Sequence, residues 1–117
     1  MAEAFRNAAH GLMSVIAGSS KIDSNEERVI SLVALDCENL LVRWLTEILF
    51  LYDAEKFLTA DAKFDMLNNI SLKATVLGQK YDPLNHELKL DIKAITYHKL
   101  MVEKLDDIWT ARVFVDI

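Results

Sequence analysis

The sequence has few of the residues from which small domains build covalent, metal-bound or phosphate-binding frameworks. It contains one cysteine, Cys37, so no internal disulfide can form, and no cysteine and histidine cluster provides a zinc motif. The three glycines, Gly11, Gly18 and Gly78, lie far apart in the chain, which excludes a phosphate-binding loop and a dinucleotide fingerprint. No nucleotide-binding motif is therefore predicted.

Long hydrophobic runs and an excess of positive charge are also missing. The most apolar run, LLVRWLTEILFLY, contains Arg43 and Glu47 and is shorter than the roughly 20 residues that a membrane span needs. The first residues, MAEAFRNAAHGLM, lack the charge pattern and apolar centre of a secretory signal. A net charge of −5 opposes strong attachment to a phosphate backbone. We therefore expect a cytoplasmic protein that does not bind nucleic acid strongly by itself.

The hydrophobic residues that are present suffice for one core. They make up 52% of the 117 residues, which predicts a single domain over residues 1–117. Hydrophobic periodicity and turn residues predict helices at 3–16 and 36–52 and strands at 28–35, 62–67, 71–77, 92–102 and 109–117. Asn68 and Asn69 form the expected turn of a hairpin, and Pro83 lies in a loop. The order predicts an α+β fold in which two main helices pack on one face of a largely antiparallel sheet.

Catalytic signatures are mostly absent. His10, His86 and His98 are widely separated in the sequence, and no serine or cysteine forms a recognisable triad with them. We therefore expect no catalytic residues and a protein that is not itself an enzyme.

The strand DIKAITYHKL carries polar residues where valine would be more usual. Strict alternation places Thr96 and His98 on one face with apolar neighbours, and places Lys93, Ile95 and Tyr97 on the other. One interpretation is a solvated strand with hydrogen-bonded polar side chains. The other is a rigid set of side chains that binds a partner surface or an anion. Both interpretations remain open on this pattern alone.

Acidic groups gather at two further places. The Asp116 side chain and the α-carboxylate of Ile117 offer hard oxygen ligands for Ca²⁺, Mg²⁺ or Mn²⁺, unless the last residues fray into solvent. Asp36 and Glu38 stand between a strand and a helix, where a helix cap and an acid that complements the helix dipole explain them. Their position also permits a metal or partner contact.

Several stretches together resemble the archease family. They are EAFRNAAHGLMSVI, DCENLLVRWLTEILFLYDAE, DIKAITYHKLMV and VFVDI, which follow in the family's order over nearly the whole chain. The resemblance implies a small α+β protein that activates the RtcB-type RNA ligase of tRNA splicing. It implies promotion of ligase guanylylation and of multiple turnover, with GTP belonging to the ligase. A chaperone-like modulator of nucleic-acid methyltransferases is the alternative.

The resemblance also assigns residues. It implies a metal site at Asp116 and Ile117, and it makes Lys93, Thr96, Tyr97 and His98 candidates for ligase contact or for supporting the metal. Asp36 and Glu38 join these candidates. The family has a further acidic ligand in an N-terminal strand of the H-T-A-D type, whereas this sequence starts inside the first helix. We therefore expect that strand to be missing, and the sheet edge that it leaves to favour pairing between copies of the chain.

Overall fold

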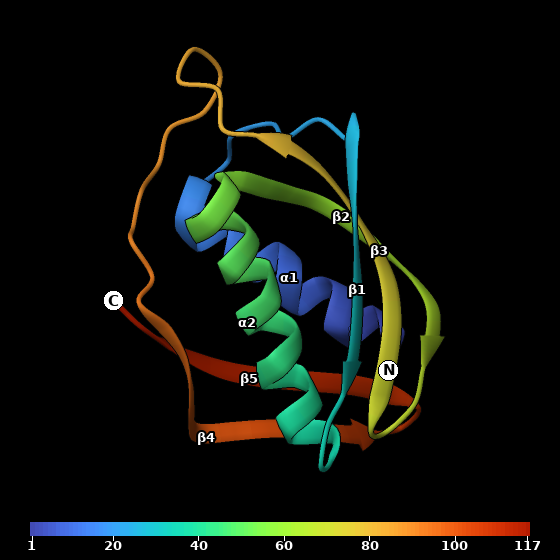
Figure 1. Ribbon diagram of the computed structural model, residues 1–117. Coiled ribbons are helices and arrows are strands. Elements are labelled where there is room, and N and C mark those ends of the chain that lie inside the picture. The colour runs from blue at the N-terminus through green and yellow to red at the C-terminus, as the bar shows by residue number, and fades with distance from the viewer.

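The computed structural model describes residues 1–117 and contains two helices and five strands (Figure 1). In chain order these are α1 (Ala2–Ala17), β1 (Glu26–Val33), α2 (Cys37–Glu55), β2 (Phe57–Leu67), β3 (Ser71–Lys80), β4 (Ala94–Leu105) and β5 (Ile108–Asp116). Their order and types agree with the prediction, and the α+β class is confirmed. Neither helix is long and apolar enough to cross a membrane.

The first sheet contains three antiparallel strands in the order β1-β3-β2. The predicted hairpin joins β2 to β3, and Asn68 makes its turn because its side-chain Oδ1 accepts the N–H groups of Ile70 (3.0 Å) and Ser71 (2.9 Å). Alternate residues of β3, including Ala74 and Val76, are buried against the helices. This sheet therefore has one apolar face, as the alternating sequence predicts.

Helix α2 begins as its sequence predicts. The side chain of Asp36 accepts the N–H of Asn39 at 2.7 Å, which satisfies one of the free donors of the first turn. Buried positions lie around most of the circumference of this helix. They are Leu40, Leu41, Val42, Trp44, Leu45, Ile48, Leu49, Leu51 and Tyr52. A helix that is apolar over most of its surface must be covered on more than one side.

The cover on the other side comes from a second sheet. Strands β4 and β5 do not join the first sheet, but form a separate antiparallel pair that crosses below both helices (Figure 1). The helices thus lie between the two sheets. The prediction of one sheet held for β1, β2 and β3, and the division into two sheets follows from the wide apolar surface of α2.

Strand β4 contains a large bulge that strict alternation did not predict. Residues 97–100 lie opposite Val113 alone, and Lys99 at the centre of the bulge has a φ of 50°. The bulge changes which side chains face inward. Ile95 before the bulge and Val102 after it both pack against the core, although strict alternation places them on opposite faces. His98 is exposed, so the predicted assignment of Ile95 and His98 to faces was wrong.

The segment between β3 and β4 runs along the outside of α1 and α2 (Figure 1). His86 anchors this segment, because its buried Nδ1 accepts the N–H of Asp82 (2.9 Å) and its Nε2 donates to the carbonyl of Lys21 (3.0 Å). The N–H of Lys89 also donates to the carbonyl of Ile16 at 2.7 Å. These bonds leave His86 with a structural role.

Candidate functional site

The first group of predicted residues lies where β5 ends. Strand β5 stays paired up to Asp116, which lies opposite Ala94, and the carbonyl of Asp116 accepts the N–H of Lys93 at 2.7 Å. Inward residues Val113 and Val115 alternate with outward residues, so the Asp116 side chain is exposed on the outer face of the β4-β5 sheet. The backbone of the last strand is therefore fixed rather than frayed up to Asp116.

The oxygen atoms of this group are of the kind that a hard divalent cation binds, but there are too few of them to complete its coordination. The Asp116 side chain and the Ile117 α-carboxylate bring oxygen atoms to one exposed end of a strand. No three histidine, cysteine, aspartate or glutamate side chains in the structure come together as a metal-binding group. Because Ca²⁺ takes six to eight oxygen ligands and Mg²⁺ six, water or another molecule would have to supply the rest. A metal at Asp116 and Ile117 stays a prediction.

The second group lies where α2 begins. Asn39 connects it to β4, because its Nδ2 donates to the hydroxyl of Tyr97 at 2.6 Å while its Oδ1 accepts the N–H of Leu35 at 3.1 Å. Asp36 acts as the helix cap described above, and Glu38 adds negative charge in the first turn. The fold therefore brings Asp36, Glu38 and Tyr97 into one neighbourhood.

Thr96 and His98 lie on β4 beside Tyr97. The hydroxyl of Thr96 accepts the N–H of His98 at 3.1 Å, which stabilises the start of the bulge. The ring of His98 lies 5.6 Å from that of Phe114, which alternates outward on β5 like Asp116. Thr96, His98, Phe114 and Asp116 lie on the outer face of the β4-β5 sheet, whereas the hydroxyl of Tyr97 reaches the start of α2. We use the name outer face for these four residues together with the exposed side chain of Tyr97 beside them.

Asn39 is the residue that the sequence did not single out. It stands three positions after Asp36, which is where a helix cap finds its backbone donor, but its side chain contacts a tyrosine 58 positions later. The local pattern could have indicated the cap. The contact with Tyr97 depends on how β4 crosses α2 and has no signal in the sequence.

The electrostatics of the α2 start argue against a reactive thiol. Burial raises the pKa of the Cys37 thiol, and the negative charges of Glu38 and Asp36 raise it further. Its Sγ lies 3.5 Å from the Sδ of Met1. The thiol is therefore protonated at neutral pH, and the thiolate needed for nucleophilic attack or for metal binding is disfavoured.

An ion pair away from the outer face joins α1 to β2. Arg6 donates to the two carboxylate oxygens of Asp61 at 2.6 and 2.9 Å, and His10 Nε2 lies 3.2 Å from the same carboxylate. The hydrogen bond from Arg6 is the main reason that the pKa of Asp61 lies below its usual value. His10, His86 and His98 occupy three separate places: His10 beside Asp61, His86 at the carbonyl of Lys21, and His98 beside Phe114.

The sequence model of the Archease protein family matches residues 1–117 of the chain. The chain belongs to the archease family. The resemblance drawn from the sequence motifs is confirmed over the whole chain. Membership makes it an archease-type accessory protein, and the family implies a connection with tRNA splicing.

Curated relatives agree with this family. Protein archease of Sulfolobus acidocaldarius is 37% identical over 116 residues, which cover 98% of this chain and 84% of the relative. Protein archease of Methanosarcina acetivorans is 35% identical over 119 residues, covering 98% and 82%. Protein archease of Pyrococcus abyssi is 37% identical over 119 residues, covering 98% and 84%. None of these names gives a catalytic activity.

A solved structure has the same fold as this archease. The solution structure of Methanobacterium thermoautotrophicum protein 1598 superposes with a TM-score of 0.82 at 30% sequence identity. The alignment covers 99% of this chain and 84% of that one. The α+β architecture with two helices and antiparallel sheets is therefore shared with this protein.

Proposed function

We propose that this archease activates an RtcB-type RNA ligase of tRNA splicing by promoting guanylylation of the ligase and its repeated turnover. The observation that carries the proposal is the family match over all 117 residues. The absence of a phosphate-binding loop in the sequence and the net charge of −5 agree with a division of labour in which the ligase holds GTP and RNA.

The outer face is the surface that we assign to the ligase. Tyr97 supports this assignment, since its side chain is 57% exposed although its hydroxyl is held by Asn39. A large aromatic side chain that is fixed before binding loses little conformational freedom when a partner covers it. Thr96 and His98 flank Tyr97 on β4, and Lys93, just before the strand, completes the proposed contact.

We further assign a divalent cation, Ca²⁺, Mg²⁺ or Mn²⁺, to the carboxylates of Asp116 and Ile117. The ion would supply positive charge next to phosphate-bearing groups of the ligase complex. Asp116 would hold it at a fixed position, because the Asp116 carbonyl is bonded to the N–H of Lys93 and β5 is paired to its end.

The proposal is tested by multiple-turnover ligation with a purified RtcB-type ligase, GTP, Mn²⁺ and a cleaved tRNA substrate. Added archease is expected to raise the number of ligations per ligase. The Asp116→Asn variant is expected to stimulate ligation about tenfold less than the wild type, or not at all, because it removes a proposed metal ligand. Asp107→Asn is the matched control, since Asp107 lies at the opposite end of the same sheet with a φ of 62°, a conformation that asparagine tolerates.

Two outcomes would count against this proposal. Equal stimulation by the wild type and by Asp116→Asn would remove the metal role while leaving the activation. No stimulation, combined with metal-independent protection of a nucleic-acid methyltransferase from aggregation, would favour the chaperone-like alternative.

A further inference from the structure

Asn39 makes hydrogen bonds with both ends of its side-chain amide. Its Oδ1 accepts the backbone N–H of Leu35 at 3.1 Å, and its Nδ2 donates to the hydroxyl of Tyr97 at 2.6 Å. The first bond decides how the amide is oriented, because a backbone N–H can only donate and must face the oxygen. The nitrogen, which can only donate, is then left for Tyr97. The hydroxyl of Tyr97 is consequently the acceptor in this contact.

The hydroxyl of Tyr97 keeps its own proton for another acceptor. A phenol group can accept hydrogen bonds on its oxygen and also donates one. The bond from Asn39 uses a lone pair of the oxygen, and no group within residues 1–117 accepts the phenol proton. Because the Tyr97 side chain is 57% exposed, this proton is available at the surface of the molecule.

The backbone on both sides of Tyr97 is also held. Before it, the hydroxyl of Thr96 accepts the N–H of His98 at 3.1 Å, and after it, Arg112 Nε donates to the carbonyl of Lys99 at 3.1 Å. These two bonds stabilise the bulge at the place where β4 passes the start of α2. None of the bonds around Tyr97 involves either end of the chain. The ring, the hydroxyl and the backbone of Tyr97 are therefore fixed together.

The position of Asn39 in α2 explains only half of its side chain. It stands three residues after the cap Asp36, where a glutamate or glutamine side chain commonly accepts a free backbone N–H just before the helix. The Oδ1 of Asn39 does this for Leu35. A carboxylate oxygen would serve equally well, so the helix start does not require the amide nitrogen. The nitrogen therefore has its role in the contact with Tyr97.

We propose that Asn39 is a positioning residue that holds Tyr97 as a hydrogen-bond donor for an acceptor oxygen of the ligase. A side chain that is fixed before binding loses little conformational freedom when a partner covers it. Asp36 and Glu38 lie within three residues of Asn39 and repel an anion. The acceptor that this place favours is therefore an uncharged oxygen, such as a backbone carbonyl. The role of Asn39 rests on the ligase contact proposed above.

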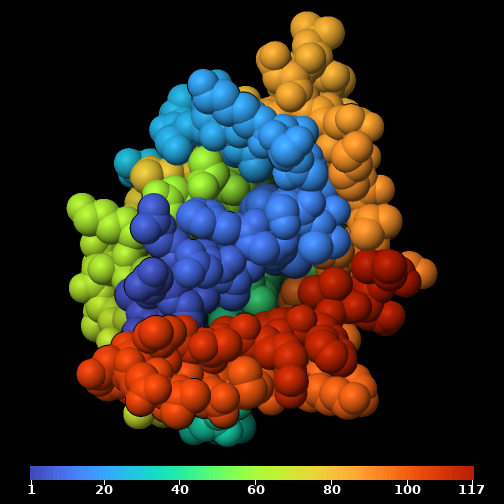
Figure 2. Space-filling model, turned by 180° about the vertical axis from the view of Figure 1, so that it is seen from behind, coloured from blue at the N-terminus to red at the C-terminus, as the bar shows by residue number.

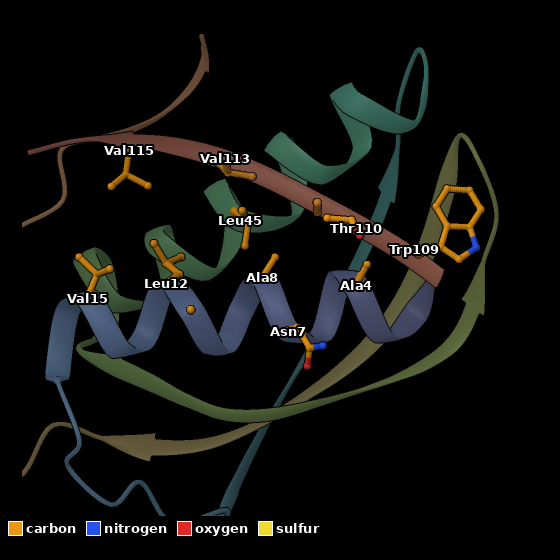
Figure 3. Close-up of a pocket in the computed structure, with 12 residues that line it drawn as sticks. Ala4, Asn7, Ala8, Leu12, Val15, Leu45, Trp109, Thr110, Val113 and Val115 are labelled. Atoms are coloured by element: carbon orange, nitrogen blue, oxygen red, sulfur yellow. The ribbon is translucent and has the colours of Figure 1, made fainter. Parts of the chain in front are cut away.

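The contact between Asn39 and Tyr97 lies outside the packing of α1 on β5. In Figure 2 the blue atoms of α1 lie against the orange-red atoms of the β4-β5 hairpin. An apolar cavity of about 460 Å³ lies between α1 and β5, and Ala8, Leu12 and Val113 are among the residues that line it (Figure 3). Neither Asn39 nor Tyr97 lines this cavity. Substitutions of these two residues therefore leave the packing of α1 on β5 in place.

Three variants separate the position of the Tyr97 ring from its proton. Asn39→Ala removes the contact and frees the ring. Asn39→Asp keeps the ring held, because one carboxylate oxygen accepts the N–H of Leu35 and the other accepts the phenol proton, which is then no longer available to a partner. Tyr97→Phe keeps the ring and removes the hydroxyl. An aspartate is also favourable in the first turn of a helix, so Asn39→Asp is expected to fold.

The test measures the concentration of archease that gives half-maximal guanylylation of a purified RtcB-type ligase with labelled GTP and Mn²⁺. Each of the three variants is expected to raise this concentration by about five- to tenfold, the loss that one hydrogen bond to the ligase would cause. The maximal rate of labelling is expected to stay the same, because Asp116 and Ile117 are unchanged. A residue that only supported folding would not change the concentration needed by the folded protein.

The double variant Asn39→Asp with Tyr97→Phe is the matched control for the added charge. It is expected to need the same concentration as Tyr97→Phe alone, because no phenol proton remains for the aspartate to accept. A further rise in the double variant would show that the negative charge acts on the ligase directly, and this would overturn the role of the phenol as donor.

Two further results would overturn the proposal while leaving ligase activation in place. Wild-type behaviour of Asn39→Asp would mean that the phenol proton is not donated to the ligase, and wild-type behaviour of Asn39→Ala would mean that Asn39 does not position Tyr97. Both results are seen only if the wild type activates the ligase. No activation by the wild type itself would instead remove the proposed function, and the role of Asn39 with it.

NMR of the unbound chain tests the positioning without the ligase. Nuclear Overhauser contacts between the side-chain amide protons of Asn39 and the ring of Tyr97 are expected in the wild type. Their absence would contradict the positioning of Tyr97, whatever the result of the guanylylation assay.

Discussion

Replacing Trp44 with alanine is expected to lower the free energy of unfolding by about 3–5 kcal/mol. The indole ring has no exposed surface and its centre lies 5.0 Å from that of Phe64, so its removal leaves a large cavity between α2 and β2. Its Nε1 also donates to the carbonyl of Phe5 at 3.0 Å, and this hydrogen bond would be lost. One side chain thus connects α1, α2 and β2.

Chemical denaturation followed by circular dichroism measures this loss. Trp44→Phe keeps an aromatic ring but not the hydrogen bond, so its loss should be smaller than that of alanine. Phe50→Ala is the control on the same helix, because the side chain of Phe50 is 59% exposed. Its free energy of unfolding is expected to change by no more than about 1 kcal/mol. A loss of less than about 1 kcal/mol in Trp44→Ala would contradict the packing described for the core.

Gly78→Ala is expected to destabilise the protein by about 1–3 kcal/mol or more, although it adds only one methyl group. The added Cβ would lie 2.0 Å from the backbone oxygen of Leu58 and 3.0 Å from the ring of Phe57. Backbone atoms cannot rotate away as a side chain can, so β2 would have to move from β3. The register of β2 and β3 already shifts next to this point, after Thr59.

Gly11→Ala makes the matched comparison, because there the same methyl group enters open space on a helix. Alanine is favoured over glycine in a helix interior, so a gain of about 0.5–1 kcal/mol is expected. A loss of stability in Gly78→Ala and a gain in Gly11→Ala, measured in the same denaturation experiment, would confirm the close contact at Gly78 and the open space at Gly11. A loss of stability in Gly11→Ala would contradict the open space beside Gly11.

The sequence predicts the elements whose signals are local. Asp36 was expected to cap α2, and Asn68 to make the β2-β3 turn, because a side-chain oxygen near a few free N–H groups needs no distant partner. The alternation of β5 likewise identifies its inward residues. These features depend on contacts between residues that are close in the chain.

The features that the sequence did not predict depend on distant contacts. The bulge of β4 is held in part by Arg112, whose Nε donates to the carbonyl of Lys99 at 3.1 Å, and a period-two pattern contains no sign of it. The link from Asn39 to Tyr97 arises only when the second sheet crosses the helices. The candidate residues could therefore be named from the sequence, but not their grouping.

The central claim, that this archease activates an RNA ligase, is tested most directly by following the guanylylated form of the ligase. A purified RtcB-type ligase is mixed with labelled GTP and Mn²⁺, with and without archease at about one tenth of the ligase concentration. Labelling of the ligase is expected to be faster and more complete when archease is present, because each archease molecule would act on many ligase molecules. Equal labelling with and without archease would contradict a role as activator.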